Sequence, residues 1–138
     1  MTTANDWNQS IIEEFRANEG IVGGPFAGAT MLLLTHAGRK TGTERTNPLV
    51  YLDDGARILI FASKGGAPEH PDWYRNLLAN PAVTIEVGTE KFGVEATEVV
   101  GAERDRLYEK NAALRPAFAQ YQRNTTRKIP VIALERKG

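Results

Sequence analysis

The stretch Val83–Val99, VTIEVGTEKFGVEATEV, carries the clearest structural signal in the chain. Apolar and polar residues alternate on both sides of Gly88-Thr89-Glu90, which has the composition of a tight turn. Such alternation is typical of strands with one buried face, and a short glycine-containing connection between two of them forms a hairpin. We therefore predict an antiparallel hairpin over residues 83–99.

Other segments extend this antiparallel pattern. Asp53-Asp54-Gly55 is a tight-turn sequence between two apolar runs, and Gly23-Gly24-Pro25 marks a loop after a first helix. Strands are predicted at residues 31–35, 48–52, 57–62 and 129–135, and helices at residues 1–20, 71–78, 103–114 and after Pro116. About six strands with mostly hairpin-length connections favour an antiparallel sheet over alternating βαβ units. The expected fold is mainly β or α+β, a small barrel with peripheral helices, in one domain over residues 1–138.

The composition excludes several classes of function. Seventeen basic side chains balance 17 acidic ones, so no overall field favours nucleic acid. Cysteine is absent, and His36 and His70, the two histidines, lack a paired metal-ligand spacing, so neither thiolate catalysis nor a metal site is expected. The N-terminus has no secretory pattern, and no apolar run approaches the roughly 20 residues of a membrane span. We therefore expect a cytoplasmic protein.

Two stretches have the composition of anion-binding loops. Gly38–Leu49, GRKTGTERTNPL, combines basic side chains with glycines and threonines, and Ala62–Gly66, ASKGG, follows an apolar run just before a helix. Glycines allow close backbone approach, hydroxyl and N–H groups donate to anionic oxygens, and lysine or arginine neutralises the charge. Neither stretch is a P-loop, and Ser63 lacks the GxSxG context of an acyl-transfer nucleophile. Solvated turns and a shared polyanion groove remain alternative interpretations.

Two further segments combine packing with chemical character. In His70–Pro81, HPDWYRNLLANP, Trp73 and Leu77 are predicted to face the core, while Asn76 is placed to hydrogen-bond either a loop or a ligand. Later, Phe118 and Tyr121 share one face if their segment is helical. That pair either covers the open end of the barrel or forms the wall of a substrate pocket.

Together these motifs resemble the deazaflavin-dependent nitroreductase family, a group of actinobacterial split-β-barrel proteins. The resemblance extends from about Leu32 to Leu134 and is carried by GRKTG at Gly38–Gly42, NPL at Asn47–Leu49, ASKGG at Ala62–Gly66, HPDWYRNLLANP at His70–Pro81 and Ile129-Pro130. It implies a split β-barrel that binds coenzyme F420, whose phosphate and oligoglutamate tail are anionic. It also implies an oxidoreductase that transfers hydride from the reduced deazaflavin to a quinone, enone or nitroaromatic acceptor.

The resemblance assigns roles by position. The phosphate and tail would be held by Arg39, Lys40, Thr41, Gly42 and Arg45. The deazaflavin side would be lined by Pro48, Leu49, Ala62, Ser63, Lys64, Gly65 and Asn76. The acceptor pocket would include Val50, Phe118 and Tyr121, and the proton would come from Tyr121, Ser63 or water. Val50, Arg115 and Phe118 stand where the nitroreductase branch has tyrosines, which disfavours nitroimidazole reduction but leaves cofactor binding intact.

Several alternatives stay open at this point. A related barrel would bind FMN instead of F420, and a non-catalytic F420 or FMN carrier would keep the cationic loops without a productive acceptor pocket. The first helix, with Trp7, Ile11 and Phe15 at helical spacing, either packs on the barrel or makes peripheral membrane contact. The sequence does not distinguish a monomer from a homodimer.

Overall fold

The fold is built from six strands and four α-helices in a computed structural model that describes residues 4–22, 30–55 and 57–136. The helices are α1 (Ala4–Ala17), α2 (Asp72–Ala79), α3 (Gly101–Leu114), α4 (Pro116–Arg123) and the short 3-10 helix η2 (Lys64–Gly66). The strands are β1 (Met31–Ala37), β2 (Glu44–Asp54), β3 (Arg57–Phe61), β4 (Ala82–Val87), β5 (Glu90–Val99) and β6 (Val131–Arg136).

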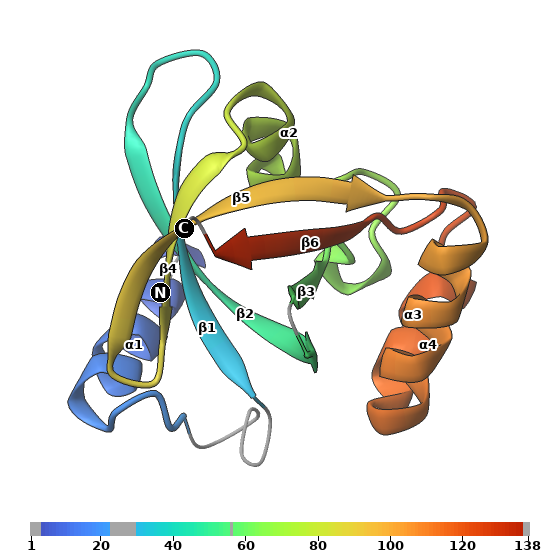
Figure 1. Cartoon of the computed structure of the whole chain (residues 1–138), viewed down its shortest axis with the longest axis horizontal. Helices are drawn as coiled ribbons and strands as arrows, with labels where there is room; N and C mark the ends of the chain where they lie inside the picture. The colour runs from blue at the N-terminus through green and yellow to red at the C-terminus, as the bar shows by residue number, and fades with distance from the viewer. Residues whose placement is uncertain (1–3, 23–29, 56, 137–138) are drawn as a thin grey trace.

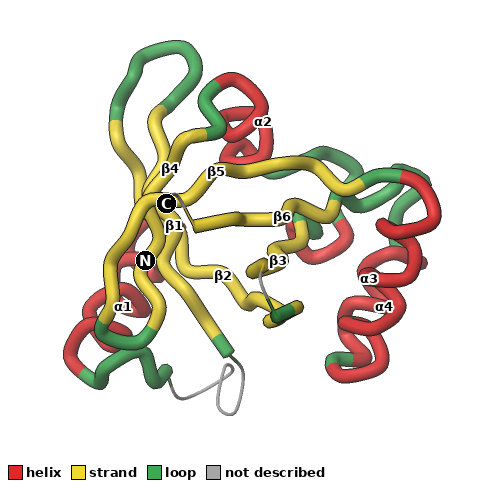
Figure 2. Tube along the Cα trace, viewed as in Figure 1, coloured by secondary structure: helices red, strands yellow, loops and turns green. Residues whose placement is uncertain are grey.

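The strands form a closed barrel in the order β1-β2-β3-β6-β5-β4, in which every neighbouring pair is antiparallel (Figures 1 and 2). The predicted hairpin is confirmed as β4 and β5, with Ile85 opposite Phe92. β6 enters the sheet between β3 and β5, which is a long-range pairing. The predicted antiparallel barrel with peripheral helices is therefore confirmed.

One prediction needs correction: β2 begins at Glu44 and not at Pro48, so residues 44–47 are strand and not loop. Pro48 obscured this, because proline removes a ladder donor and is rare in central strands. Tyr51 donates its backbone N–H to Thr30 on the β1 side at 3.1 Å. Successive N–H groups alternate between the two edges of a strand, so the position of Pro48 faces away from β1. On that edge β3 pairs only with residues 51–54. No strand therefore faces Pro48 there, and its missing N–H removes no hydrogen bond from the sheet.

The barrel interior is filled by alternate strand residues and closed at one end by α2. Leu32 and Leu34 of β1 are buried in the interior cluster, as is Ile85 of β4. Trp73 and Leu77 of α2 belong to the same cluster, which confirms their predicted core-facing positions. The apolar face of α2 therefore packs into the end of the barrel and attaches this helix, with the chain on either side of it, to the barrel interior.

Two helical layers cover the outside of the barrel (Figure 1). Ile11 and Phe15 of α1 pack against Leu33, whose side chain points outward between the inward-facing Leu32 and Leu34. The α3–α4 pair covers β3 and β6 through a second cluster that includes Leu107 and Phe118. For Ile11 and Phe15 the barrel-packing interpretation is thus confirmed, while the side chain of Trp7 lies outside the described residues. None of the described helices is long and apolar enough to cross a membrane.

Candidate cofactor and acceptor site

The site begins where β2 and β3 separate. β2 pairs with β1 as far as Glu44 but with β3 only over Tyr51–Asp54. Continuing the β2–β3 register would set Ala62 opposite Leu49 and Ser63 opposite Pro48, but β3 ends at Phe61 and the chain leaves the sheet. The edge of β2 before Tyr51 is therefore unpaired with β3, while Leu49 of β2 and Ala62 after β3 both pack in the interior cluster. Two of the predicted deazaflavin-side residues are thus brought to the same cluster.

The first cationic loop, Gly38–Thr43, joins β1 to β2 and is a compact turn. Gly42 donates its N–H to Gly38 O at 2.8 Å and adopts a φ of 72°, which favours glycine. The Thr41 hydroxyl donates to the Thr43 hydroxyl at 3.0 Å, so this threonine braces the loop. Arg39 and Lys40 are exposed at the tip. The loop therefore presents its cations to solvent on a shape fixed largely by its own bonds.

A buried polar chain anchors the first cationic loop to α2. The Arg39 N–H and guanidinium both donate to Asn76 Oδ1 at 3.1 Å, and Asn76 Nδ2 lies 3.1 Å from His36 Nδ1. Because Asn76 Oδ1 accepts, its Nδ2 donates, so His36 Nδ1 is unprotonated and His36 Nε2 donates to Asn47 Oδ1 at 2.6 Å. Burial lowers the pKa of His36, and the charge of Arg45 lowers it further, consistent with this neutral tautomer. Of the two predicted partners for Asn76, the loop is the one observed.

The second cationic loop, Ala62–Ala67, contains η2 and follows β3. Ser63 lies in the right-handed region, with φ −77° and ψ −38°, and Lys64 in the left-handed region, with a φ of 46°. A right-handed residue followed by a left-handed one turns successive N–H groups toward a common side, an arrangement that binds anions. The Ser63 hydroxyl does not cap η2, and Lys64 is exposed. The Ser63 N–H is bonded to Phe61 O at 2.9 Å. The loop therefore offers a ligand the Lys64 and Gly65 N–H groups, the Ser63 hydroxyl and the Lys64 charge.

The predicted acceptor residues meet beside the second cationic loop. Val50 and Tyr121 are half-buried and pack against the outer cluster that contains Phe118, and the Phe118 and Tyr121 rings are 5.3 Å apart. A Cβ placed on Gly66 would come within 2.8 Å of Tyr121 O, so α4 rests directly on the loop. These aromatic residues cover the outer face of β3 and β6, whereas α2 closes the barrel end. They therefore form a wall next to the loop, not a lid over the barrel.

The charges of the site fit an anionic ligand. Among the residues that the structure describes, Arg39, Lys40, Arg45 and Lys64 form no ion pair with a carboxylate, although seven ion pairs occur elsewhere. Exposed cations that have no carboxylate partner keep their charge available for a phosphate or carboxylate of a ligand. The chain is neutral overall, so this local excess depends on position and not on composition.

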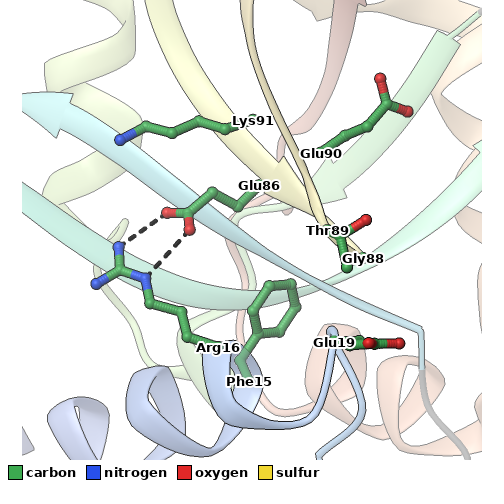
Figure 3. Close-up of a pocket in the computed structure, with 8 residues that line it drawn as sticks. All are labelled: Phe15, Arg16, Glu19, Glu86, Gly88, Thr89, Glu90 and Lys91. Atoms are coloured by element: carbon green, nitrogen blue, oxygen red, sulfur yellow. Dashed lines mark hydrogen bonds and ion pairs between the residues drawn. The ribbon is translucent and has the colours of Figure 1, made fainter.

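Sequence reasoning missed Arg127, which donates to three carbonyls of the second cationic loop. Its only sequence signal is a basic residue shortly before Ile129-Pro130, which does not indicate a buried role. A pocket of about 210 Å³ lies away from the site, between α1 and the β4–β5 turn (Figure 3). Arg16 spans it to Glu86 with two bonds of 2.9 and 3.1 Å, so it serves to hold α1. No group of three or more metal-ligating side chains occurs within the described ranges.

A closed antiparallel barrel with a split edge and two cationic loops beside aromatic side chains defines the class as a split-barrel protein. The profile of the F420H(2)-dependent quinone reductase family matches residues 7–136, and the chain belongs to that family.

Known relatives agree in sequence and in structure. An F420H(2)-dependent quinone reductase of Mycobacterium tuberculosis is 44% identical over 129 residues, which cover 89% of this chain and 85% of the relative. A solved F420-H2 dependent reductase, FDR-A, shares 36% identity with a TM-score of 0.70, over 77% of this chain and 94% of its own. Another solved chain, described as a domain-swapped dimer, shares 32% identity with a TM-score of 0.72, over 96% of this chain and 100% of its own. The chain is accordingly an F420-dependent oxidoreductase, and its cofactor is coenzyme F420.

Proposed function

We propose that this chain uses reduced F420 to reduce a quinone bound against Val50, Phe118 and Tyr121. The observation that carries the proposal is the contact between Gly66 and Tyr121, because it sets the acceptor wall beside the cofactor loop. An apolar and aromatic wall suits a planar quinone ring. The quinone is favoured over a nitroimidazole because Val50 and Phe118 carry no hydroxyl to bind a nitro group.

The cofactor would be held from both sides of the split edge. Arg39, Lys40 and Arg45 would neutralise the anionic tail, with Thr41 and Gly42 shaping the turn. Pro48, Leu49, Ala62, Ser63, Lys64, Gly65 and Asn76 would line the ring side. The Asn76 amide is bonded to Arg39 and His36 in this structure. Its proposed role is therefore to hold the first cationic loop in position as well as to border the ring.

The protein's own part in the reaction is positioning and proton supply. When bound, reduced F420 supplies the hydride. The chain holds ring and acceptor together and excludes water with the α4 wall. The proton that completes reduction of the quinone oxygen would come from Tyr121 Oη, from Ser63 Oγ or from water. Tyr121→Phe and Ser63→Ala distinguish these, since the variant that removes the donor lowers kcat at saturating F420 about tenfold or more.

The first experiment is a fluorescence titration with F420 and, separately, with FMN, followed by turnover of reduced F420 with a naphthoquinone and with a nitroaromatic. Saturable F420 binding, weaker FMN binding and quinone-dependent oxidation of reduced F420 are the expected results. Binding of F420 without turnover on any acceptor would instead favour the carrier alternative. Tighter binding of FMN would contradict the proposal.

We also propose that residues 1–138 act as one cofactor-binding unit and that α1 serves the barrel, not a membrane. The burial of Ile11 and Phe15 supports this use of α1. A molecular mass measured by light scattering would distinguish a monomer from a homodimer. Both states are worth examining because one similar solved chain is described as a domain-swapped dimer.

A further inference from the structure

Arg127 lies between α4 and β6, and its half-buried guanidinium makes four contacts around the second cationic loop. It donates to Ala67 O at 2.9 Å, to Ala62 O at 3.1 Å and to Ser63 O at 2.7 Å. It also lies 3.0 Å from His70 Nδ1. Every one of these acceptors belongs to the short segment between β3 and α2. A single side chain therefore gathers the carbonyls of the loop onto one side.

Gathering the carbonyls fixes where the loop amides point. In a planar trans peptide the C=O and the following N–H point in opposite directions. Because Ser63 O faces Arg127, the N–H of Lys64 faces away from it. Arg127 therefore lies on the carbonyl side of the loop, and the opposite side is the one that carries the anion-binding amide.

The contacts require the shape of a guanidinium. Its planar fork has five donors in fixed directions, whereas a lysine ammonium is a compact charge that cannot span three separated carbonyls. Arg127 has no ion pair with a carboxylate in the described part of the chain, so the loop carbonyls are its main counter-charge. Burial lowers the pKa of Arg127, but arginine stays charged at neutral pH.

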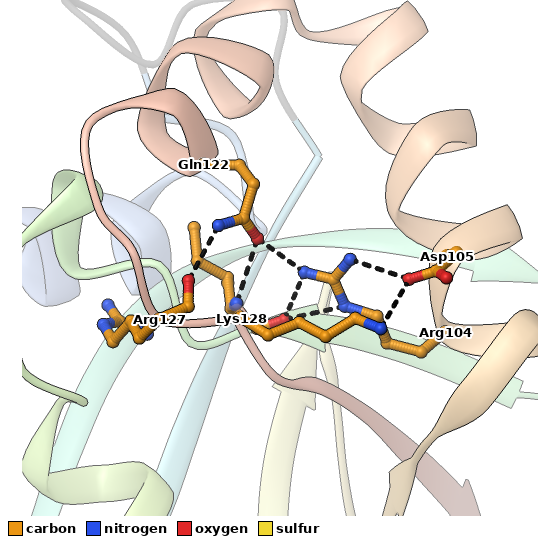
Figure 4. Close-up of polar contacts among 6 residues, drawn as sticks. Arg104, Asp105, Gln122, Arg127 and Lys128 are labelled. Carbon is orange, nitrogen blue, oxygen red and sulfur yellow. Dashed lines mark hydrogen bonds and ion pairs between the residues drawn. The ribbon is translucent and has the colours of Figure 1, made fainter.

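Arg127 is itself held in place from the helical layer (Figure 4). Gln122 of α4 donates from Nε2 to Arg127 O at 2.8 Å, and its Oε1 accepts from Arg104 of α3 at 2.7 Å. Arg104 also donates to Ile129 O, at 3.0 and 2.7 Å. Arg104 thus binds one backbone carbonyl, that of Ile129, and reaches Arg127 only through Gln122; it does not touch the loop.

We propose that Arg127 is a positioning residue for the cofactor: it holds the second cationic loop in its anion-binding shape without contacting the reacting atoms. The inference rests on the proposed cofactor role of this loop. The inference predicts that F420 binds more weakly when the Arg127 guanidinium is removed. The second cationic loop must then be ordered by the ligand itself, and this ordering reduces the affinity. Once F420 is saturating, the loop is again in place and turnover recovers.

The test compares Arg127→Lys with Arg57→Lys, which removes another half-buried guanidinium whose two bonds, to Glu103 and Asp54, lie outside the loop and outside the contacts that hold Arg127. For Arg127→Lys the expected result is a rise of about tenfold in the Kd and KM for F420, with kcat and the quinone KM within about twofold of the wild type. Arg57→Lys is expected to lower the melting temperature while the Kd for F420 stays within about twofold. A folded Arg127→Lys protein with wild-type affinity overturns the inference, and so does an equal loss of affinity in Arg57→Lys.

A second variant keeps the inference testable if Arg127→Lys does not fold. Arg127→Gly is titrated with F420 in the presence of millimolar guanidinium or, as the uncharged planar control, urea. Recovery of affinity with guanidinium alone is expected, and equal behaviour of the two additives overturns the inference. Wild-type protein that fails to bind F420 would count against the proposed function itself, so the two failures are distinguishable.

Discussion

The two cationic loops offer the same chemistry but are held in different ways. The first cationic loop is exposed, is braced by its own turn bonds and is anchored to the rest of the protein through Arg39 and Asn76. The second has three carbonyls bound by Arg127 and packs against α4 at Gly66. The difference supports a division of labour within the proposed site, in which the first loop would supply charge for the flexible tail and the second would supply shape next to the reacting ring.

The largest expected effect comes from removing one lysine in each loop. Lys40→Ala with Lys64→Ala should weaken F420 binding at least tenfold and about a hundredfold if each charge-assisted contact contributes about 1.5 kcal/mol. Of the single variants, Lys40→Ala should cost more, because the first cationic loop supplies charge for the anionic tail whereas the second mainly supplies shape. The measurement is a fluorescence titration, with Lys91→Ala combined with Lys110→Ala as the charge-matched control. Equal single effects would remove the proposed division of labour.

Asn76→Leu should release the first cationic loop while leaving the second in place. The substitution leaves His36 Nδ1 and the Arg39 N–H without their partner, and we expect the free energy of unfolding to fall by about 2–3 kcal/mol. Urea unfolding measures this loss, and Asn80→Leu, at the exposed end of α2, is the control. A loss no larger than that of the control would show that the polar chain does not anchor the loop.

Gly66→Ala probes the packing of α4 on the second cationic loop. Gly66 and Gly55 both have positive φ values, 84° and 74°, but only Gly66 has neighbours within reach of a Cβ. Backbone strain is therefore common to Gly66→Ala and Gly55→Ala, and the clash with Tyr121 O should make Gly66→Ala worse by about 1–2 kcal/mol. Parallel thermal unfolding of the two variants gives the difference. Equal losses would mean that α4 moves away from the loop without cost.

The smallest expected effect is a pH dependence shared by both loops. Burial lowers the pKa of His36 beneath the first loop and of His70 beneath the second, where Arg127 adds to the effect. Below about pH 6.5 the unfolded chain then binds more protons than the folded chain, so the free energy of unfolding falls as the pH drops. The urea midpoint should decline between about pH 7 and pH 5, and less steeply in His70→Gln. A midpoint that is unchanged over this range contradicts the assignment of neutral histidines.

The outline of the fold followed from local patterns, and the extent of one strand did not. Alternation around Gly88-Thr89-Glu90 predicted the β4–β5 hairpin, and the spacing of Trp73 and Leu77 predicted the buried face of α2. The start of β2 at Glu44 was hidden by Pro48, since only the absence of a β3 partner at that edge makes the proline acceptable. Local propensity carries no information on which strand edge is free.

The sequence by itself determined the secondary-structure order, the two cationic loops and, by resemblance, the family and its cofactor. The tertiary structure alone decided that β2 is unpaired with β3 before Tyr51, that Asn76 bonds the first loop, and that Arg127 bonds the second. Composition and periodicity record what each residue prefers locally. Contacts between residues 60 or more positions apart, such as those of Arg127 with Ala62 and Ala67, depend on barrel closure and the seating of α4, which no local pattern specifies.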